Sequence, residues 1–151
     1  MFRYGWARYR EGVKEEGLTS MRKAIKVDST NISYLTKTSE VLMREGDQEY
    51  LKEAKGLLDT VLKQDPENID ALVCYGRIIE KIGESLESAK KYYERAIAVP
   101  DSNHVNAHFY LGVLCEKLKD YERAIKLLKQ TLVYDQKHFG ACIHLATMLA
   151  N

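Results

Sequence analysis

The sequence predicts an all-α protein built from repeated helical hairpins, and three observations lead to this fold class. The 151 residues include only two prolines and nine glycines, which favours long helices over many short strands. Apolar residues recur at intervals of three and four, which is the spacing of one helix face. A short motif also recurs along the whole chain, and such internal repetition decides the architecture of a protein.

A small residue that follows Tyr, Thr or Leu marks each copy of this motif. The copies are Tyr4-Gly5, Thr38-Ser39, Tyr75-Gly76, Leu111-Gly112 and Leu145-Ala146, so successive small residues lie 34, 37, 36 and 34 positions apart. Three further columns recur in register, at offsets of +4 and +3 that place them on one helix face. These columns are Gly17, Ala54, Ala89 and Ala124, then Met21, Leu58, Tyr93 and Leu128, and then Ala24, Val61, Ala96 and Thr131.

Each repeat contains two helices, and the best-preserved copy predicts one over 105–117 and another over 121–134, with a break at Lys119-Asp120. Glycine occupies the same break elsewhere, at Gly12, Gly46 and Gly83, as expected of the residue just past a helix end. Proline or Asx residues end the second helices, at Asp28-Ser29, Asp65-Pro66, Pro100-Asp101 and Asp135-Gln136.

One hairpin cannot bury both of its apolar faces, so the hairpins must stack on one another. We therefore predict an α-α superhelix, or solenoid, of about four stacked helix-turn-helix repeats in a single domain over 1–151. The expected units are 1–31, 32–68, 69–104, 105–138 and a lone first helix over 139–151. Small residues such as Gly76 with Ala89 and Gly112 with Ala124 let the paired backbones approach, while larger neighbours such as Tyr93 and Leu128 fill the surrounding space.

The repeat resembles the tetratricopeptide repeat, a helix-turn-helix unit with a W-x2-L-G-x2-Y, A-x3-F, A and P pattern. The stretches 107–115 and 120–125 are similar to that consensus, as are 71–76, Ala89, Tyr93, Ala96 and Asp65-Pro66. Thr38 and Ser39 depart from the pattern, and the two middle units are lengthened. The resemblance implies a protein-interaction scaffold whose first helices line a concave groove that binds a partner peptide or helix.

The resemblance also implies which side chains face this groove, because fixed positions of each first helix do so in the family. The groove residues carried over are Trp6, Tyr9, Arg10, Thr36, Glu40, Met43, Arg44, Val73, Arg77, Glu80, Lys81, Phe109, Val113, Glu116 and Lys117. The same family positions also include Phe2, Ser33, Asp70 and Asn106, and the partial fifth unit adds Ile143 and Thr147.

Two features of this groove have alternative interpretations. Trp6 and Tyr9 either anchor a partner or pack against an upstream repeat. The cations Arg10, Arg44, Lys81 and Lys117, one per unit, either neutralise an acidic peptide or form an ordinary solvated column. The family's clamp for chaperone C-terminal carboxylates is not expected, because only Arg77 has suitable chemistry at the required positions.

The helix expected over 139–151 is apolar nearly all round. This pattern favours a fragment of a longer repeat protein, or else self-association through the apolar face. Two further alternatives come from other function classes: a regulatory or substrate-recruiting arm of a larger enzyme, and a structural subunit of a transport or ciliary assembly.

Composition excludes several other classes. A formal net charge of +1 argues against nucleic-acid binding, no apolar run is long enough for a membrane span, and no signal peptide is evident, so we expect a cytoplasmic protein. No catalytic, phosphate-binding or cofactor motif is present. His104 with His108 and His138 with Cys142 lack a third ligand, so no metal site is expected. Cys74, Cys115 and Cys142 are expected to be buried small apolar groups.

Overall fold

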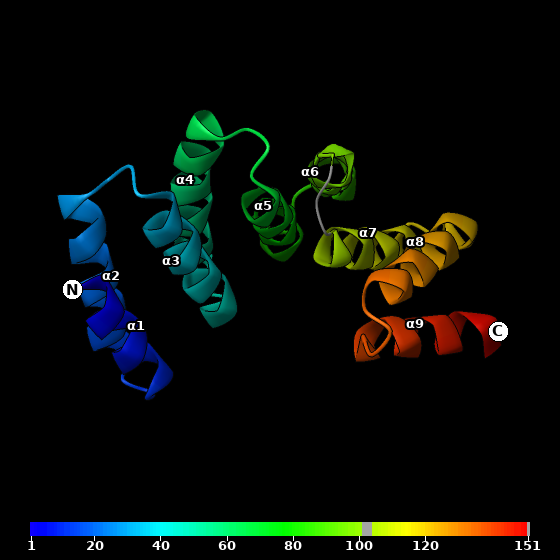
Figure 1. The fold of residues 1–151 in the computed structure, drawn as a ribbon, viewed down its shortest axis with the longest axis horizontal. Coiled ribbons are helices and arrows are strands. Elements are labelled where there is room, and N and C mark those ends of the chain that lie inside the picture. Colours follow the sequence, from blue (N-terminus) through cyan, green and yellow to red (C-terminus); the bar gives the residue numbers. More distant parts are fainter. Residues whose placement is uncertain (101–103, 151) are drawn as a thin grey trace. The chain divides into compact units, whose positions relative to one another are not determined.

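The structure is a computed structural model and describes residues 1–100 and 104–150. All regular structure in these two ranges is helical, which confirms the predicted fold class (Figure 1). The helices are α1 (Phe2–Arg10), α2 (Lys14–Val27), α3 (Ile32–Glu45), α4 (Gln48–Gln64), α5 (Ile69–Ile82), α6 (Leu86–Ala98), α7 (Val105–Lys117), α8 (Tyr121–Tyr134) and α9 (Phe139–Ala150). Asp101 of the predicted Pro100-Asp101 helix end, and Asn151 of the last predicted helix, lie outside the described residues.

The helix ends follow from local chemistry. The bounds of α7 and α8 are those predicted from the sequence. Gly12, Gly46 and Gly83 have φ angles of 92°, 74° and 88°, which confirms the left-handed glycine at the break of three hairpins. In the fourth hairpin Lys119 takes this conformation, with a φ of 65°. At the opposite ends, side chains such as that of Asn68, which accepts from the Ala71 backbone N–H at 3.0 Å, cap the helix start.

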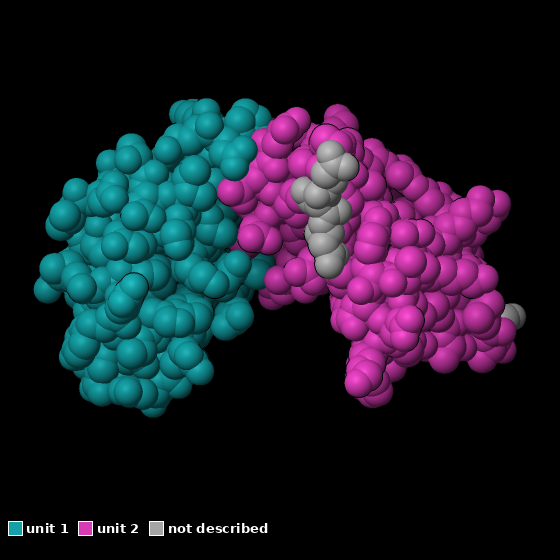
Figure 2. Space-filling model, viewed as in Figure 1, with its two compact units in different colours: residues 1–66 teal, residues 67–151 magenta. Residues whose placement is uncertain are grey.

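The chain forms two compact units, one of residues 1–66 and one of residues 67–151 (Figure 2). In the first unit α1 packs on α2, α3 packs on α4, and α2 contacts α3. In the second unit α5 packs on α6, α7 packs on α8, and the contacts between α6 and α7 and between α8 and α9 join successive hairpins. Within each unit, hairpins therefore stack on hairpins, because each one needs a neighbour to bury its second apolar face.

The predicted apolar columns form the core of both units. Ala24 has an exposed fraction of 5%, and Gly17 is also buried. The other column residues are fully covered: Met21, Ala54, Leu58, Val61, Ala89, Tyr93, Ala96, Ala124, Leu128 and Thr131. Thr131, the one threonine in these columns, donates its hydroxyl hydrogen to the Leu127 carbonyl at 3.0 Å. A buried hydroxyl is tolerated in this column because its hydrogen bond stays within the helix.

The prediction that small residues lie where paired helices meet holds for Gly76 and Gly112, but the expected contact of backbone with backbone does not. Gly76 and Gly112 lie against the partner helix, but what covers them is a side chain: an added Cβ would stand 2.6 Å from Tyr93 Cε1 or 2.9 Å from Leu128 Cγ. The close approach of two backbones occurs instead between α1 and α2. A Cβ on Gly5 would lie 2.7 Å from the Gly17 carbonyl oxygen, and one on Gly17 would lie 2.7 Å from that of Gly5.

The prediction of three buried cysteines is wrong for one of them. Cys74 and Cys115 are buried, and burial raises the pKa of the Cys115 thiol, so that it stays protonated. Cys142 is exposed. Helix α9 buries Ala141 and Leu145 against α8, and Cys142 projects from a different side of this helix.

Candidate functional site

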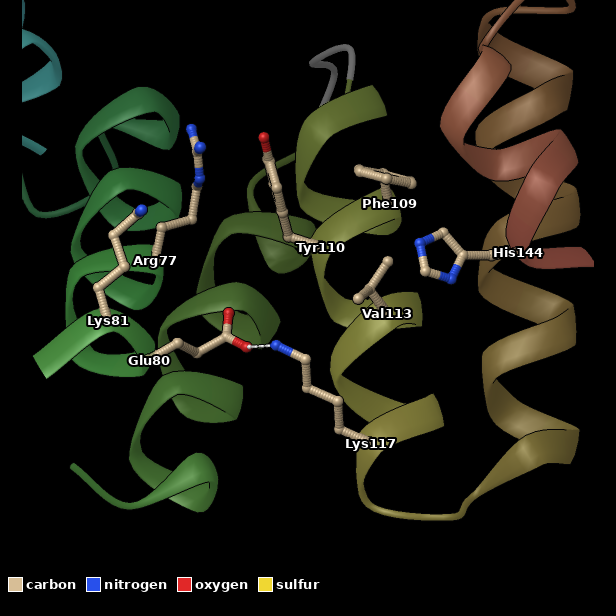
Figure 3. A pocket seen from close by; sticks show the side chains of 8 residues that line it. All are labelled: Arg77, Glu80, Lys81, Phe109, Tyr110, Val113, Lys117 and His144. Carbon is tan, nitrogen blue, oxygen red and sulfur yellow. Dashed lines mark hydrogen bonds and ion pairs between the residues drawn. The ribbon is translucent and has the colours of Figure 1, made fainter. Parts of the chain in front are cut away.

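A pocket of about 390 Å³ opens in the second unit, where side chains from α5, α7 and α9 meet (Figure 3). Its lining consists of Arg77, Glu80, Lys81, Phe109, Tyr110, Val113, Lys117 and His144. The sequence predicted six of these residues as groove residues, and Tyr110 and His144 are the two that it missed. The helical repeat explains why the predicted residues gather: Arg77, Glu80 and Lys81 lie three and four positions apart and so share one face of α5.

The one carboxylate in this pocket, that of Glu80, is compensated by partners within the protein. It accepts a hydrogen bond from the Tyr93 hydroxyl of α6, and Lys117 Nζ of α7 lies 3.1 Å from its other oxygen. Only 15% of the Glu80 side chain is exposed. Burial of the Tyr93 ring and the neighbouring Glu80 carboxylate raise the pKa of Tyr93 far above its ordinary value, so this phenol remains a neutral donor.

Two cations of the pocket are not compensated in this way. The Arg77 guanidinium lies over the Tyr110 ring, 4.4 Å from its centroid, and Figure 3 shows the two side chains side by side. In the described part of the chain, neither Arg77 nor Lys81 forms an ion pair with a carboxylate. The α5 end of the pocket therefore has a surplus of positive charge beside an aromatic surface.

The opposite end of the pocket is apolar and continues into a second hollow. Phe109 packs over Gly140 of α9, where an added Cβ would stand 2.8 Å from the ring. The second hollow, of about 710 Å³, shares Val113, Lys117 and His144 with the first. It adds Glu116, Tyr121, Thr147 and Met148. Together the two hollows form one trough along α7, which we call the α7 trough.

The second carboxylate of the α7 trough, that of Glu116, is also paired. His144 Nδ1 of α9 lies 2.6 Å from Glu116 Oε2. The sequence expected Ile143 to face the groove from this helix, but Ile143 is 47% exposed and lines neither hollow, whereas the adjacent His144 lines both. Thr147, also expected, does line the second hollow.

The first unit has a separate hollow of about 340 Å³, lined by Phe2, Arg3, Trp6, Ser33, Tyr34 and Lys37. Three predicted groove residues line it, namely Phe2, Trp6 and Ser33. Lys37 Nζ lies 5.7 Å from the centroid of the Trp6 ring. Tyr9 instead joins α1 to α3, because its hydroxyl donates to Glu45 Oε1 at 2.7 Å. Burial and this carboxylate raise the pKa of Tyr9 to about 12.

The remaining predicted groove residues do not line any of these three hollows. Thr36, Met43 and Val73 are buried, with exposed fractions of 9%, 2% and 6%, so their side chains serve packing in this structure. Arg10 and Arg44 are exposed and Glu40 is half-buried. Of the predicted basic column, the structure brings Lys81 and Lys117 into one pocket.

A family profile described as tetratricopeptide repeat matches residues 83–137. A solved structure of PilF from Pseudomonas aeruginosa superposes with a TM-score of 0.84 at 18% identity, covering 99% of this chain and 66% of that one. Residues 83–137 thus carry tetratricopeptide repeat sequence, and the chain has the fold of tetratricopeptide repeat proteins. TTC0263, a tetratricopeptide repeat protein of Thermus thermophilus, superposes with a TM-score of 0.81 at 16% identity, covering 99% of this chain and 80% of that one.

Two further proteins are similar to this chain. MamA from Desulfovibrio magneticus RS-1 superposes with a TM-score of 0.77 at 22% identity, covering 97% of this chain and 81% of that one. Protein NPGR1 of Arabidopsis thaliana is 31% identical over 93 residues, which make up 60% of this chain and 13% of that protein. The chain thus spans a small part of this curated relative, and the likeness to the solved structures is one of fold.

Two other kinds of site are absent from the described ranges. In residues 1–100 and 104–150, no three His, Cys, Asp or Glu side chains are grouped so that they could hold a metal ion. No helix within the same ranges has both the length and the apolar character needed to cross a membrane.

Proposed function

We propose that this chain is an interaction scaffold that binds a partner peptide or helix in the α7 trough. A tetratricopeptide fold supports this function, and the composition of the trough supports the location. Aromatic and apolar side chains provide contact area, and charged groups beside them provide orientation, which is the usual make-up of a peptide-binding groove.

The observation that carries the proposal is the contrast between the acids and the bases of the trough. Both carboxylates have partners within the protein, Glu80 with Tyr93 and Lys117 and Glu116 with His144. Arg77 and Lys81 have no carboxylate partner in the part of the chain that the structure describes. Unpaired cations beside a half-buried aromatic ring are groups that a ligand can satisfy, and Arg and aromatic residues dominate binding energies at interfaces.

The test is selection of peptides from a displayed random library on the immobilised full chain, followed by fluorescence anisotropy with each enriched peptide. Arg77→Glu is expected to weaken binding by at least about tenfold, because it both removes a cation and adds a repelling charge. Lys129→Glu is the matched control, since it makes the same charge change at an exposed position of α8 that lines no hollow. Enriched peptides that bind the Arg77→Glu and control variants equally would contradict the location.

Self-association is a second candidate function, and the exposed apolar side chains of α9 favour it. Phe139, Ile143 and Leu149 of this helix have exposed fractions of 76%, 47% and 65%. Large apolar side chains exposed together on one helix are a usual feature of association surfaces. Sedimentation velocity over a range of concentrations is expected to show a dimer that Leu149→Glu dissociates, and a concentration-independent monomer would contradict this candidate.

A further inference from the structure

The α7 trough is basic at its α5 end and largely apolar at its α9 end. We propose that it binds a peptide in a single orientation, with the acidic part of the peptide at the α5 end. An acidic side chain of the ligand lies against Arg77 and Lys81, and an apolar side chain lies between Val113, Tyr121 and Met148. This inference rests on the proposed function and adds to it the chemical class of the partner, an acidic peptide with a neighbouring apolar residue, and the orientation in which the peptide is held.

The α5 end selects the acidic group. Stacking on Tyr110 at 4.4 Å holds the Arg77 guanidinium in place and covers one of its faces, while the N–H groups at its edge remain able to donate to a carboxylate. Lys81 lies one helical turn further along the same face of α5 and is exposed. A guanidinium that is already immobilised loses less conformational entropy when a ligand binds.

Glu80, which lies between these two cations in the sequence, does not cancel them. Its charge is shared by the Lys117 ammonium at 3.1 Å and the Tyr93 hydroxyl, and most of its side chain is covered. Because Lys117 neutralises Glu80, the charges of Arg77 and Lys81 remain as the net charge of this end. The local surplus is therefore positive although the whole chain has a formal net charge of only +1.

The α9 end selects the apolar group. Tyr121 is 51% exposed there, and Met148 is packed partly against the buried cluster of Leu128, Ala141 and Leu145. A methionine side chain adapts its shape to an incoming apolar group. The Glu116 carboxylate lines this hollow too, so an acidic ligand group placed here would meet a like charge in place of two cations.

The direction can be measured with two acetylated tetrapeptide amides, Glu-Ser-Ala-Leu and its neutral counterpart Gln-Ser-Ala-Leu, titrated into the isotope-labelled full chain and followed by NMR. Both peptides are expected to shift signals of the Met148 methyl group, and only the first is expected to shift those of Arg77 and Lys81. A nitroxide attached at the acidic end is expected to broaden signals of α5 more than those of α9.

Variants separate the two ends. Lys81→Gln is expected to weaken binding of the Glu peptide several-fold and to leave the Gln peptide within about twofold, whereas Met148→Ala is expected to weaken both alike. Arg77→Gln provides a second loss of charge at the same end, and Lys129→Gln on α8 is the matched control. Neither Arg77 nor Lys81 is buried in the core, so Arg77→Gln and Lys81→Gln are expected to leave the fold intact.

Each result bears on a different claim. Stronger broadening of α9 by the nitroxide at the acidic end would overturn the proposed direction. Equal binding of the Glu and Gln peptides in the trough would overturn the acidic chemistry while leaving the proposed function in place. Shifts that occur only outside the trough, for these peptides and for every library-selected peptide, would contradict the proposed function itself.

Discussion

The first and the fourth hairpins have the same fold, but they bring their helices together in different ways. Between α1 and α2, Gly5 and Gly17 face each other, and a Cβ on either would meet the other's carbonyl oxygen at 2.7 Å. Between α7 and α8, Gly112 faces the side chain of Leu128, with the nearest atom at 2.9 Å from an added Cβ. Backbone atoms cannot move aside as a leucine side chain can. The same repeat position should therefore tolerate an added methyl group less well at Gly5 than at Gly112.

The second hairpin shows a third arrangement, without glycine. Ser39 stands at the repeat position that glycine holds in the other hairpins, and its hydroxyl donates to the Leu35 carbonyl at 2.7 Å. The adjacent Thr38 hydroxyl is fully buried and has no hydrogen-bond partner within the described residues. Thr38 and Ser39, which depart from the repeat pattern in sequence, thus also place two hydroxyl groups in the core, and only that of Ser39 is hydrogen-bonded in the part of the chain that the structure describes.

The largest expected effect comes from filling the glycine contact of the first hairpin. Gly5→Ala is expected to lower the free energy of unfolding by about 2–3 kcal/mol, because α1 and α2 must move apart to admit the methyl group. Gly112→Ala is expected to cost about 1 kcal/mol or less, since Leu128 can change its rotamer, although Gly112→Leu at the same site should cost a few kcal/mol. Urea unfolding followed by circular dichroism measures these differences.

Gly56→Ala on α4 is the matched control for both substitutions. This glycine is exposed and has no atom within 4 Å of an added Cβ, so alanine should stabilise the helix by about 0.5–1 kcal/mol. Equal losses for Gly5→Ala and Gly112→Ala would show that the two contacts do not differ in tolerance.

A second comparison concerns the tyrosine–glutamate pairs of the two units. Tyr93→Phe is expected to cost about 1.5 kcal/mol because it removes a donor from the largely covered Glu80 carboxylate, and Tyr9→Phe, at a half-buried site, less than about 1 kcal/mol. Both tyrosines have a raised pKa, about 12 for Tyr9, so the folded state favours the neutral phenol. Their stabilisation is present below the ordinary tyrosine pKa of about 10 and is lost as the pH rises from there toward the raised pKa.

Stability measured between neutral pH and pH 11 tests this dependence. The alkaline loss of stability should be smaller in the Tyr9→Phe and Tyr93→Phe variants than in the unmodified chain. Parallel pH curves for all three proteins would mean that folding does not raise the pKa of either phenol.

A smaller gain is expected at the unsatisfied hydroxyl of the second hairpin. Thr38→Val replaces a buried hydroxyl that lacks a partner in the described residues by a methyl group of similar size and should stabilise the fold by about 1 kcal/mol. Thr36→Val is the matched control, because the Thr36 hydroxyl donates to the Ile32 carbonyl at 2.7 Å and its loss brings no gain. Thermal melting that ranks the two valine variants equally would contradict the distinction.

The smallest expected effect is an acid sensitivity of the second unit. All four histidines lie at position 104 or later, and burial lowers the pKa of His108. The folded state therefore favours its neutral ring, so this contribution is present above the ordinary pKa of about 6.5 and is lost as the pH falls below it. His108→Gln should reduce the loss of amide protection factors in α7 and α8 on acidification, measured by hydrogen exchange and corrected for the intrinsic rate at each pH, and an unchanged loss would contradict this role.

Local features of the fold could be predicted from the sequence. The bounds of α7 and α8, the left-handed glycines at positions 12, 46 and 83, and the buried columns at positions such as Ala89 and Leu128 depend on residues a few positions apart. Such features are encoded by backbone hydrogen bonding and by the periodicity of one helix, so a single sequence contains them.

The candidate site was predictable only in part. Arg77, Lys81 and Phe109 follow from the helix register, whereas the roles of Tyr110 and His144 do not. The sequence also predicted groove positions for Met43 and Val73, which the structure buries, and a buried position for Cys142, which the structure exposes. In each of these positions, the outcome depends on which neighbouring helix covers the residue.

The sequence by itself therefore determined an all-α chain of repeated hairpins and the faces that those hairpins bury. The tertiary structure alone decided the charge of the trough, because Glu80 forms an ion pair with Lys117 of another hairpin, 37 positions away, and Glu116 lies within hydrogen-bond distance of His144 of α9. Ion pairs between helices depend on which side chains become neighbours when two helices pack, and the periodicity of a single helix does not encode this.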